Sequence, residues 1–408
     1  MAHSTKLGRL LSHESTVGVL LVVCALLSMG IANSAIGNDY RQIWSQPIGG
    51  HPLAHWINDG LMAVFFLLVG LEIKKEVLFG SLRTPQQALV PLLAAVGGMV
   101  VPAALYMVFN WGENTWRGFG IPMATDIAFV LAVLAVLGSR VPKEIKVFLT
   151  TLAVVDDLGA ILVIALFYST SINIAYLMLA LAQWGLLCLL GLTAYPRRKS
   201  EVVTLTLFLI IGGVVMWVLL MKSGVHASLA GILLAMAVPT FDNHPRGTAN
   251  QWQKHLHGPV YWLVLPLFVL ANTAIGLDSF DGETILSPMA KGISGGLLLG
   301  KPAGILLGIL AAMIIGKKSL PQGIAIQQWI GAACLGGIGF TMSIFVTSLA
   351  FDNPMQIEHA KAVIVSSSVV AALLGGGLLA TSRNAKKYRR LQKIQQTQKP
   401  NNYEKVHL

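Results

Sequence analysis

Long apolar runs, separated by short loops rich in glycine, proline or charge, recur about twelve times along this chain. Many of the runs reach about 20 residues, the length that a helix needs to cross roughly 30 Å of hydrocarbon. Their approximate centres lie at Val23, Phe66, Val100, Ala128, Asp157, Leu181, Ile211, Leu233, Leu265, Leu299, Ile338 and Val370. Lipid-facing backbone must satisfy its own hydrogen bonds, so the pattern predicts an all-α polytopic membrane protein with about twelve transmembrane helices.

The composition agrees with a membrane-embedded chain. Of the 408 residues, 55% are hydrophobic and 12% are charged, whereas soluble domains carry about 25% charged residues. The first apolar run, from about Thr16 to Ile31, lacks a small-residue cleavage site, so we expect a span and not a signal peptide. The three cysteines lie in apolar runs, which indicates buried thiols and neither a disulfide framework nor a zinc site.

Basic residues are distributed unevenly between the loops. The formal net charge is +11, and most lysines and arginines fall in one alternating set of loops and in the C-terminal segment. Positively charged loops stay in the cytoplasm, so an even number of spans with both termini cytoplasmic is predicted. We expect one transmembrane domain at 1–385 and a basic cytoplasmic tail at 386–408, which would contact anionic lipid headgroups and not nucleic acid.

One outer loop, at about 33–55, is long enough to hold structure of its own. It contains Pro47, Gly49, Gly50 and Pro52, which favour a hairpin or an irregular turn.

Four ionisable residues fall well inside the predicted spans, namely Asp126, Asp156, Asp157 and Lys301. A charged residue at the centre of a spanning helix costs about 2.5–3.5 kcal/mol even on the lenient insertion scale. Charges retained at such a cost indicate a functional site.

Asp156 and Asp157 form the strongest signal, in the sequence VVDDLGA near the middle of a span from about Lys143 to Ser169. Neighbouring side chains on a helix point about 100° apart, so one carboxyl group can line a cavity while the other faces a neighbouring helix. Two close carboxylates in a low dielectric cannot both ionise cheaply, so the pair can hold protons or a hard monovalent cation. Competition between protons and the cation for this pair predicts that the protein exchanges one for the other. The alternative is a pair bonded to backbone or basic groups for packing alone.

Lys301, in LLLGKPAGI, is the basic residue in mid-span. It can serve as a structural counter-charge to an aspartate, or it can lose its own proton and carry protons during exchange. Both roles stay open.

Asp126 lies in GIPMATDIAF, where Gly120 and Pro122 favour a broken span. Helix ends exposed by a break carry backbone dipoles, so Asp126 could neutralise positive N-terminal ends and Lys301 negative C-terminal ends. A second interruption, in GGIGFTMSIFV, precedes Thr341, and aligning Thr125 with Thr341 gives a weak internal match. The two interruptions favour a repeat with two broken helices.

Three further polar residues are secondary candidates: His226 in KSGVHASLAG, Asp59 near the outer end of the second span, and Thr341. A lone histidine in a helix is more often a packing residue, and Asp59 can equally be an interfacial polar residue or a cap.

Taken together, seven ordered motifs resemble NhaA-type sodium/proton antiporters: AVFFLLVGLEIKKE, PMATDIAFVLAVLAVLG, LAVVDDLGAILVIALFY, KSGVHASLAG, LPLFVLANT, GKPAGI and GFTMSIFV. The resemblance covers about 10–385 and implies inverted repeats with two broken, crossing helices in a bacterial inner (cytoplasmic) membrane. It implies Asp156 and Asp157 as the cation and proton site, with Asp157 the direct ligand. Thr125 and Asp126 would lie at the helix break, and Lys301 would be their charge partner.

The same resemblance implies an electrogenic exchange of Na⁺ or Li⁺ for H⁺ by alternating access, with more protons than sodium ions moved per cycle. No resident cofactor and no enzymatic activity are expected. Family members usually form homodimers through an outer hairpin, which matches the predicted loop at 33–55.

Regulation by pH is also implied, through a cluster at the cytoplasmic funnel formed by Glu72, Lys75, Glu76 and His257. This chain departs from the family pattern at 253–257, where the acidic member is absent, and Lys75 stands where arginine is typical. The pH at which activity begins is therefore open, and the cluster can also be ordinary positive-inside loop charge.

Four other classes fit less well. Intramembrane aspartyl proteases need acids on two helices, and Mg²⁺-dependent transferases need spaced acids near the cytoplasmic face. A channel would not couple protons to ions, and an organic-anion carrier would need a neutral or basic site. A divalent cation as cargo is disfavoured by the family resemblance alone, because hard oxygen ligands also suit Ca²⁺ and Mg²⁺.

Overall fold

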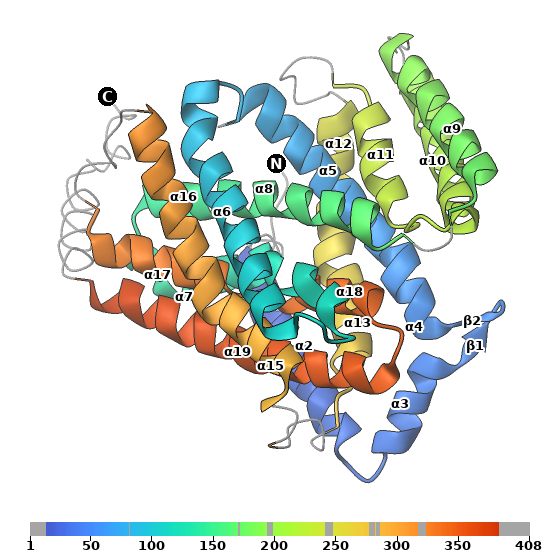
Figure 1. The fold of residues 1–408 in the computed structure, drawn as a ribbon. Helices are drawn as coiled ribbons and strands as arrows, with labels where there is room; N and C mark the ends of the chain where they lie inside the picture. Colours follow the sequence, from blue (N-terminus) through green and yellow to red (C-terminus); the bar gives the residue numbers. More distant parts are fainter. Residues whose placement is uncertain are drawn as a thin grey trace, which may run out of the picture.

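The computed structural model describes residues 14–80, 82–169, 172–193, 199–240, 248–276, 282, 286–316 and 324–382 of the chain. These residues form a bundle of helices with one small β-hairpin (Figure 1). The expectation of a predominantly helical membrane protein is thereby confirmed. The basic tail at 386–408 and the extreme N-terminus lie outside the described residues.

The α-helices are α2 (Glu14–Ala32), α3 (Gly37–Ser45), α4 (Leu53–His55), α5 (Met62–Phe79), α6 (Pro85–Asn110), α7 (Ile127–Leu137), α8 (Lys143–Phe167), α9 (Ile174–Thr193), α10 (Lys199–Ser223), α11 (Leu229–Ala237), α12 (Thr248–Pro259), α13 (Leu265–Asn272), α15 (Pro288–Gly295), α16 (Lys301–Gly316), α17 (Ile326–Gly336), α18 (Phe340–Ala350) and α19 (Pro354–Thr381). Three π-helical turns are η1 (Trp56–Leu61), η4 (Val260–Val264) and η6 (Gly296–Gly300). Two 3-10 helices are η2 (Trp116–Met123) and η3 (Gly138–Arg140).

Eight helices within the described residues are long and apolar enough to cross a membrane, and a pair bent by 114°, α2 with α3, raises the number to nine. The eight are Pro85–Asn110, Trp116–Leu137, Lys143–Phe167, Ile174–Thr193, Glu201–Ser223, Pro288–Gly316, Ile326–Ala350 and Pro354–Thr381. The three other predicted spans, centred at Phe66, Leu233 and Leu265, fall short for physical reasons. Helix α5 carries four charged residues in its second half, and α11 has only 9 residues. The span around Leu265 is divided into α12, η4 and α13, of 12, 5 and 8 residues. The total of twelve spans and the orientation of the termini therefore stay predictions.

The outer loop forms the predicted hairpin. Strands β1 (Pro47–Ile48) and β2 (His51–Pro52) pair antiparallel, and Gly49 and Gly50 connect them with φ values of 60° and 89°. Both positive angles lie in the left-handed region that glycine tolerates, as a two-residue hairpin turn of the primed type requires.

Close backbone contacts bring the central helices together. Helix α6 packs along α16 through Gly97 and Gly304, and a Cβ atom on Gly304 would lie only 2.1 Å from the Gly97 carbonyl oxygen. Small residues at such positions let membrane helices approach closely without a side chain between them. This contact places α16, which begins at Lys301, beside the centre of the bundle.

Two spans are interrupted near their middles, as the glycine and proline pattern predicts. In one, η2 ends at Met123 and α7 begins at Ile127, and in the other residues 337–339 separate α17 from α18. The interruptions lie against each other, since the Asp126 N–H donates to the Ile338 carbonyl oxygen at 2.7 Å. Their register differs from the weak internal match, because α7 begins after Thr125 whereas α18 begins before Thr341.

Candidate ion-binding site

Asp126 joins the two interrupted spans. Its Oδ1 accepts from the Phe129 N–H at 3.2 Å, in the first turn of α7. Its Oδ2 accepts from the Thr341 N–H at 2.9 Å and from the Thr341 hydroxyl group, in the first turn of α18. Free N–H groups and the positive end of the dipole meet at each helix start, so a single carboxylate compensates two N-terminal ends.

Asp156 lies on α8 opposite the same interruption and is fully buried. Its Oδ2 accepts from the Thr125 hydroxyl group at 2.5 Å and from the Lys301 ammonium group. The Thr125 hydroxyl group also lies 2.8 Å from the carbonyl oxygen of Gly336, where α17 ends. Asp156 is thus bonded to the first interrupted span and to α16, and Thr125 links it to the end of α17 in the second interrupted span.

Lys301 is completely buried and donates to the Met123 carbonyl oxygen as well as to Asp156. Met123 ends η2, so the ammonium group lies at the negative, C-terminal end of a half-span. The π-turn η6 directly precedes Lys301, and its wider turn rotates the residues that follow it.

Asp157 differs from its neighbours. It is 2% exposed, and its Oδ1 is buried without a hydrogen-bond partner among the described residues. It interacts electrostatically with Asp126, Asp156 and Lys301. A second unpartnered buried oxygen, Oδ1 of Asp156, belongs to the adjacent residue. Buried polar atoms normally have partners, so two free carboxyl oxygens on adjacent residues are suited to take up a proton or a cation.

The four ionisable residues of the predicted spans therefore lie together, with one ammonium group for three carboxyl groups. Asp126 and Asp156 have partners that compensate a negative charge, and Asp157 has none that accounts for its Oδ1. The arrangement favours Asp157 as the group whose charge state changes most readily.

The secondary candidates Asp59 and His226 lie in a separate cluster, on η1 and in the turn before α11. One Asp59 oxygen is 3.6 Å from His226 Nε2, and the other is 3.7 Å from His55 Nε2. His226 also contacts Phe345 of α18 edge-on, at 5.5 Å between ring centroids. The second ring nitrogen of His226 lies 2.9 Å from the Ser228 hydroxyl group, so this histidine has polar partners on both sides.

The predicted funnel residues Glu72, Lys75 and Glu76 lie on the last turns of α5. Lys75 Nζ lies 3.4 Å from the amide oxygen of Gln253 on α12, the helix that also carries His257. The structure thus brings α5 and α12 together, as the resemblance implies. Whether the cluster senses pH stays a prediction.

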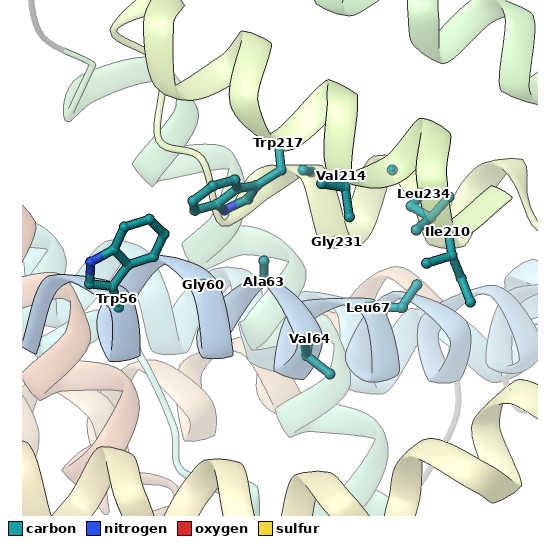
Figure 2. Close-up of a pocket in the computed structure, with 12 residues that line it drawn as sticks. Trp56, Gly60, Ala63, Val64, Leu67, Ile210, Val214, Trp217, Gly231 and Leu234 are labelled. Carbon is teal, nitrogen blue, oxygen red and sulfur yellow. The ribbon is translucent and has the colours of Figure 1, made fainter. Parts of the chain in front are cut away.

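A cavity of about 360 Å³ lies away from the acidic residues, between η1 and α5 on one side and α10 and α11 on the other. Figure 2 shows the rings of Trp56 and Trp217 at one end of it, and their centroids are 6.0 Å apart. The residues that line it are apolar or glycine, so it offers a cation no ligands.

Two serines of the site were not predicted. Ser343 on α18 donates to the Ile121 carbonyl oxygen of η2 at 2.7 Å, and the Phe340 N–H donates to Ser368 on α19 at 3.2 Å. The available signal for Ser343 was its position just after an interruption, whereas Ser368 ends a run of three serines in the middle of α19.

Comparison with known proteins agrees with this geometry. Residues 8–379 match the family model described as Na⁺/H⁺ antiporter 1. A Na(+)/H(+) antiporter NhaA from Dechloromonas aromatica is 47% identical over 378 residues, covering 91% of this chain and 95% of the relative. A Na(+)/H(+) antiporter NhaA from Cytophaga hutchinsonii is 46% identical over 365 residues (90% and 92%), and one from Vibrio cholerae is 42% identical over 378 (92% and 97%). The chain therefore belongs to the Na⁺/H⁺ antiporter 1 family of polytopic helical membrane proteins.

Proposed function

We propose that this protein exchanges Na⁺ for H⁺ across a membrane, with Asp157 and Asp156 as the shared site for the two ions. The observation that carries the proposal is the unpartnered, buried Oδ1 atom on each of these adjacent carboxyl groups. Family membership supports sodium and protons as the ions, because the relatives are named as Na(+)/H(+) antiporters.

The exchange follows from competition for the same oxygens. When the Asp157 carboxyl group holds a proton, it offers a cation one charged ligand fewer, and a bound sodium ion disfavours protonation in turn. Carboxylate oxygens are hard ligands that suit Na⁺ and Li⁺, with Thr125 and the carbonyl groups at the interruptions close by. Each cycle then carries sodium in one direction and protons in the other.

Lys301 controls the second carboxyl group in this scheme. While its ammonium group is bonded to Asp156, that carboxylate is neutralised and a proton there is unnecessary. A cation that binds Asp156 competes with Lys301, so the lysine either moves aside as a charged group or releases a proton. The second route would make exchange electrogenic, with more protons than sodium ions per cycle.

In this proposal, the interrupted spans are the part of the protein that moves during exchange. Alternating access requires the site to face each side in turn, and half-helices that contact one another through few bonds can shift relative to α8. We place the protein in a bacterial inner membrane with both termini cytoplasmic, as the family resemblance and the basic loops suggest. Dimerisation through the β-hairpin is part of the same proposal.

Everted vesicles from cells that lack their own sodium exporters test the function. A respiratory proton gradient is followed with a quenched acridine dye, and Na⁺ or Li⁺ is added from about pH 6.5 to about pH 9. We expect dequenching with the wild-type chain, and none with Asp157→Asn or Asp156→Asn. The variant Asp352→Asn, at an exposed aspartate, should behave like wild type.

A well-expressed wild-type chain that gives no dequenching with either cation at any of these pH values would overturn the proposal. Exchange that persists in both aspartate variants would support the function but would exclude Asp156 and Asp157 as the ion-binding site. Dequenching by Ca²⁺ and not by Na⁺ would assign a divalent cation as cargo.

A further inference from the structure

Lys74 on α5 makes a contact that the sequence did not suggest. Its ammonium group donates to three backbone carbonyl oxygens at the end of α11, those of Val238 at 2.6 Å, Met236 at 2.7 Å and Ala235 at 3.3 Å. The side chain is partly buried. Its neighbour Lys75 is exposed and reaches one side-chain oxygen on α12. Two adjacent lysines thus have very different environments.

The end of α11 needs such a donor. The last four carbonyl groups of a helix have no partners within it, and the dipole adds negative charge there. Pro239 ends α11, because proline lacks an N–H and forces the preceding residue, Val238, into an extended conformation. The backbone amide groups beyond the end therefore satisfy few of these carbonyl groups. A lysine from another helix supplies the missing hydrogen bonds.

Helices α5 and α11 also contact each other closely along their length, as they lie side by side in Figure 1. A Cβ atom on Gly231 would lie 2.0 Å from the Ala63 carbonyl oxygen, and one on Gly70 would lie 2.6 Å from Ala235 Cβ. The backbones are therefore nearly in contact at two heights. Lys74 adds the bond at one end of this pair.

The opposite end of the pair is held as well. There Asp59 of η1, which runs directly into α5, lies 3.6 Å from His226 in the turn before α11. The pair is thus joined by polar contacts at both ends and by small residues between them.

The cytoplasmic half of α5 relates this pair to the ion site. Helix α5 packs directly against α8, the helix that carries Asp157, and Glu72 lies on α5 two residues before Lys74. The position of α5 therefore sets the distance between the carboxyl group of Glu72, on the predicted cytoplasmic side, and Asp157, the proposed ion ligand.

We propose that Lys74 is a positioning residue for exchange, which holds the end of α11 on α5 and so fixes Glu72 relative to Asp157. The proposal rests on the proposed function and its orientation. Loss of Lys74 weakens capture of sodium from the cytoplasmic side and leaves the translocation step itself largely intact.

The test compares Lys74→Met with Lys74→Arg and with Lys254→Met, which removes an exposed lysine from α12. In everted vesicles the cytoplasmic face receives the added sodium. We expect Lys74→Met to raise the apparent KM for Na⁺ by about tenfold, equivalent to roughly 1.4 kcal/mol, with the maximal rate per molecule retained. Lys74→Arg, which keeps a charged donor, should restore most of the affinity, and Lys254→Met should leave it unchanged.

A second readout does not depend on transport. Hydrogen–deuterium exchange of peptides that cover α11 should be faster in Lys74→Met than in wild type or Lys254→Met, by about tenfold or more. If Lys74→Met does not accumulate in the membrane, Lys74→Gln, which keeps a neutral donor, replaces it in both measurements.

Unchanged KM in the charge-free variants would overturn the proposal, and so would a loss of protein level or maximal rate at constant KM. Unchanged hydrogen exchange in α11 would overturn the contact itself. A wild-type chain that moves no sodium but shows the exchange difference would overturn the proposed function and leave Lys74 as the residue that holds α11.

Discussion

Asp126 and Thr341 are 215 residues apart in the chain, yet the backbone N–H and the hydroxyl group of Thr341 both donate to one carboxyl oxygen of Asp126. The bond joins the starts of α7 and α18, each of which follows the interruption of a span. An otherwise costly charge in the membrane is stabilised there by two helix ends at once.

Replacing Thr341 by valine tests this bond. The variant keeps the shape of the side chain but removes one hydrogen bond to a charged group, so the free energy of unfolding should fall by about 1.5–3 kcal/mol. Thermal unfolding of the purified protein in detergent measures the change. Thr347→Val is the matched control, since among the described residues its hydroxyl group bonds only to the Ser343 carbonyl oxygen within α18, at 2.8 Å. Equal losses in the two variants would show that the link between the interruptions adds nothing.

Asparagine variants of the two aspartates of α8 should differ in stability, although we expect both to abolish exchange. Asp156→Asn leaves the Lys301 ammonium group buried without its carboxylate, and breaking a buried ion pair in this way costs about 3–5 kcal/mol. Asp157→Asn removes a carboxyl group whose Oδ1 has no partner among the described residues, so stability should hold or rise. Unfolding temperatures of the two variants, measured side by side, decide the matter.

A double variant sharpens that comparison. Adding Lys301→Met to Asp156→Asn removes the orphaned charge and should recover most of the lost stability without recovering exchange. If the double variant is no more stable than Asp156→Asn alone, the loss has a source other than the unpaired ammonium group.

Replacement by alanine should have opposite effects on stability at Gly304 and at Gly377, two glycines in long helices. A Cβ atom at Gly304 would lie 2.1 Å from the Gly97 carbonyl oxygen, so Gly304→Ala must push α16 away from α6 and displace Lys301. We expect lower stability and weaker exchange. Gly377 on α19 has no heavy atom within 4 Å of the same position, so Gly377→Ala should be neutral or stabilise by about 0.5–1 kcal/mol. Detergent unfolding and dye dequenching of both variants check this, and tolerance of Gly304→Ala in both assays would contradict the close packing.

The hairpin offers a prediction about assembly. Deleting residues 47–52 removes β1, β2 and the Gly49–Gly50 turn, which lie far from the acidic site in Figure 1. If the hairpin joins two copies, the purified variant should have the mass of a monomer by light scattering, while each copy still exchanges ions. A wild-type protein that is itself monomeric, or a dimeric deletion variant, would exclude the hairpin as the interface.

Local patterns in the sequence were sufficient for several features. The apolar runs predicted the helices, and all but one of their centres lie in helical segments. The exception is Ile338, which lies in the interruption between α17 and α18. The glycines and prolines around Asp126 predicted a break, and Gly49 with Gly50 predicted the hairpin. These features depend on residues close together in the chain, because hydropathy, backbone freedom and helix breaking act over a few residues.

Hydropathy and charge along the chain were thus enough to predict a helical membrane protein with interrupted spans, and to identify Asp126, Asp156, Asp157 and Lys301 as buried charges in need of an explanation. The partner of each charge depended on long-range packing: Asp126 meets Thr341, Lys301 meets Asp156, and Lys74 meets the end of α11. The apolar surroundings of a spanning helix set the free-energy cost of burying a charge. The groups that offset the cost come from distant segments, and only the packing of helices brings those segments together.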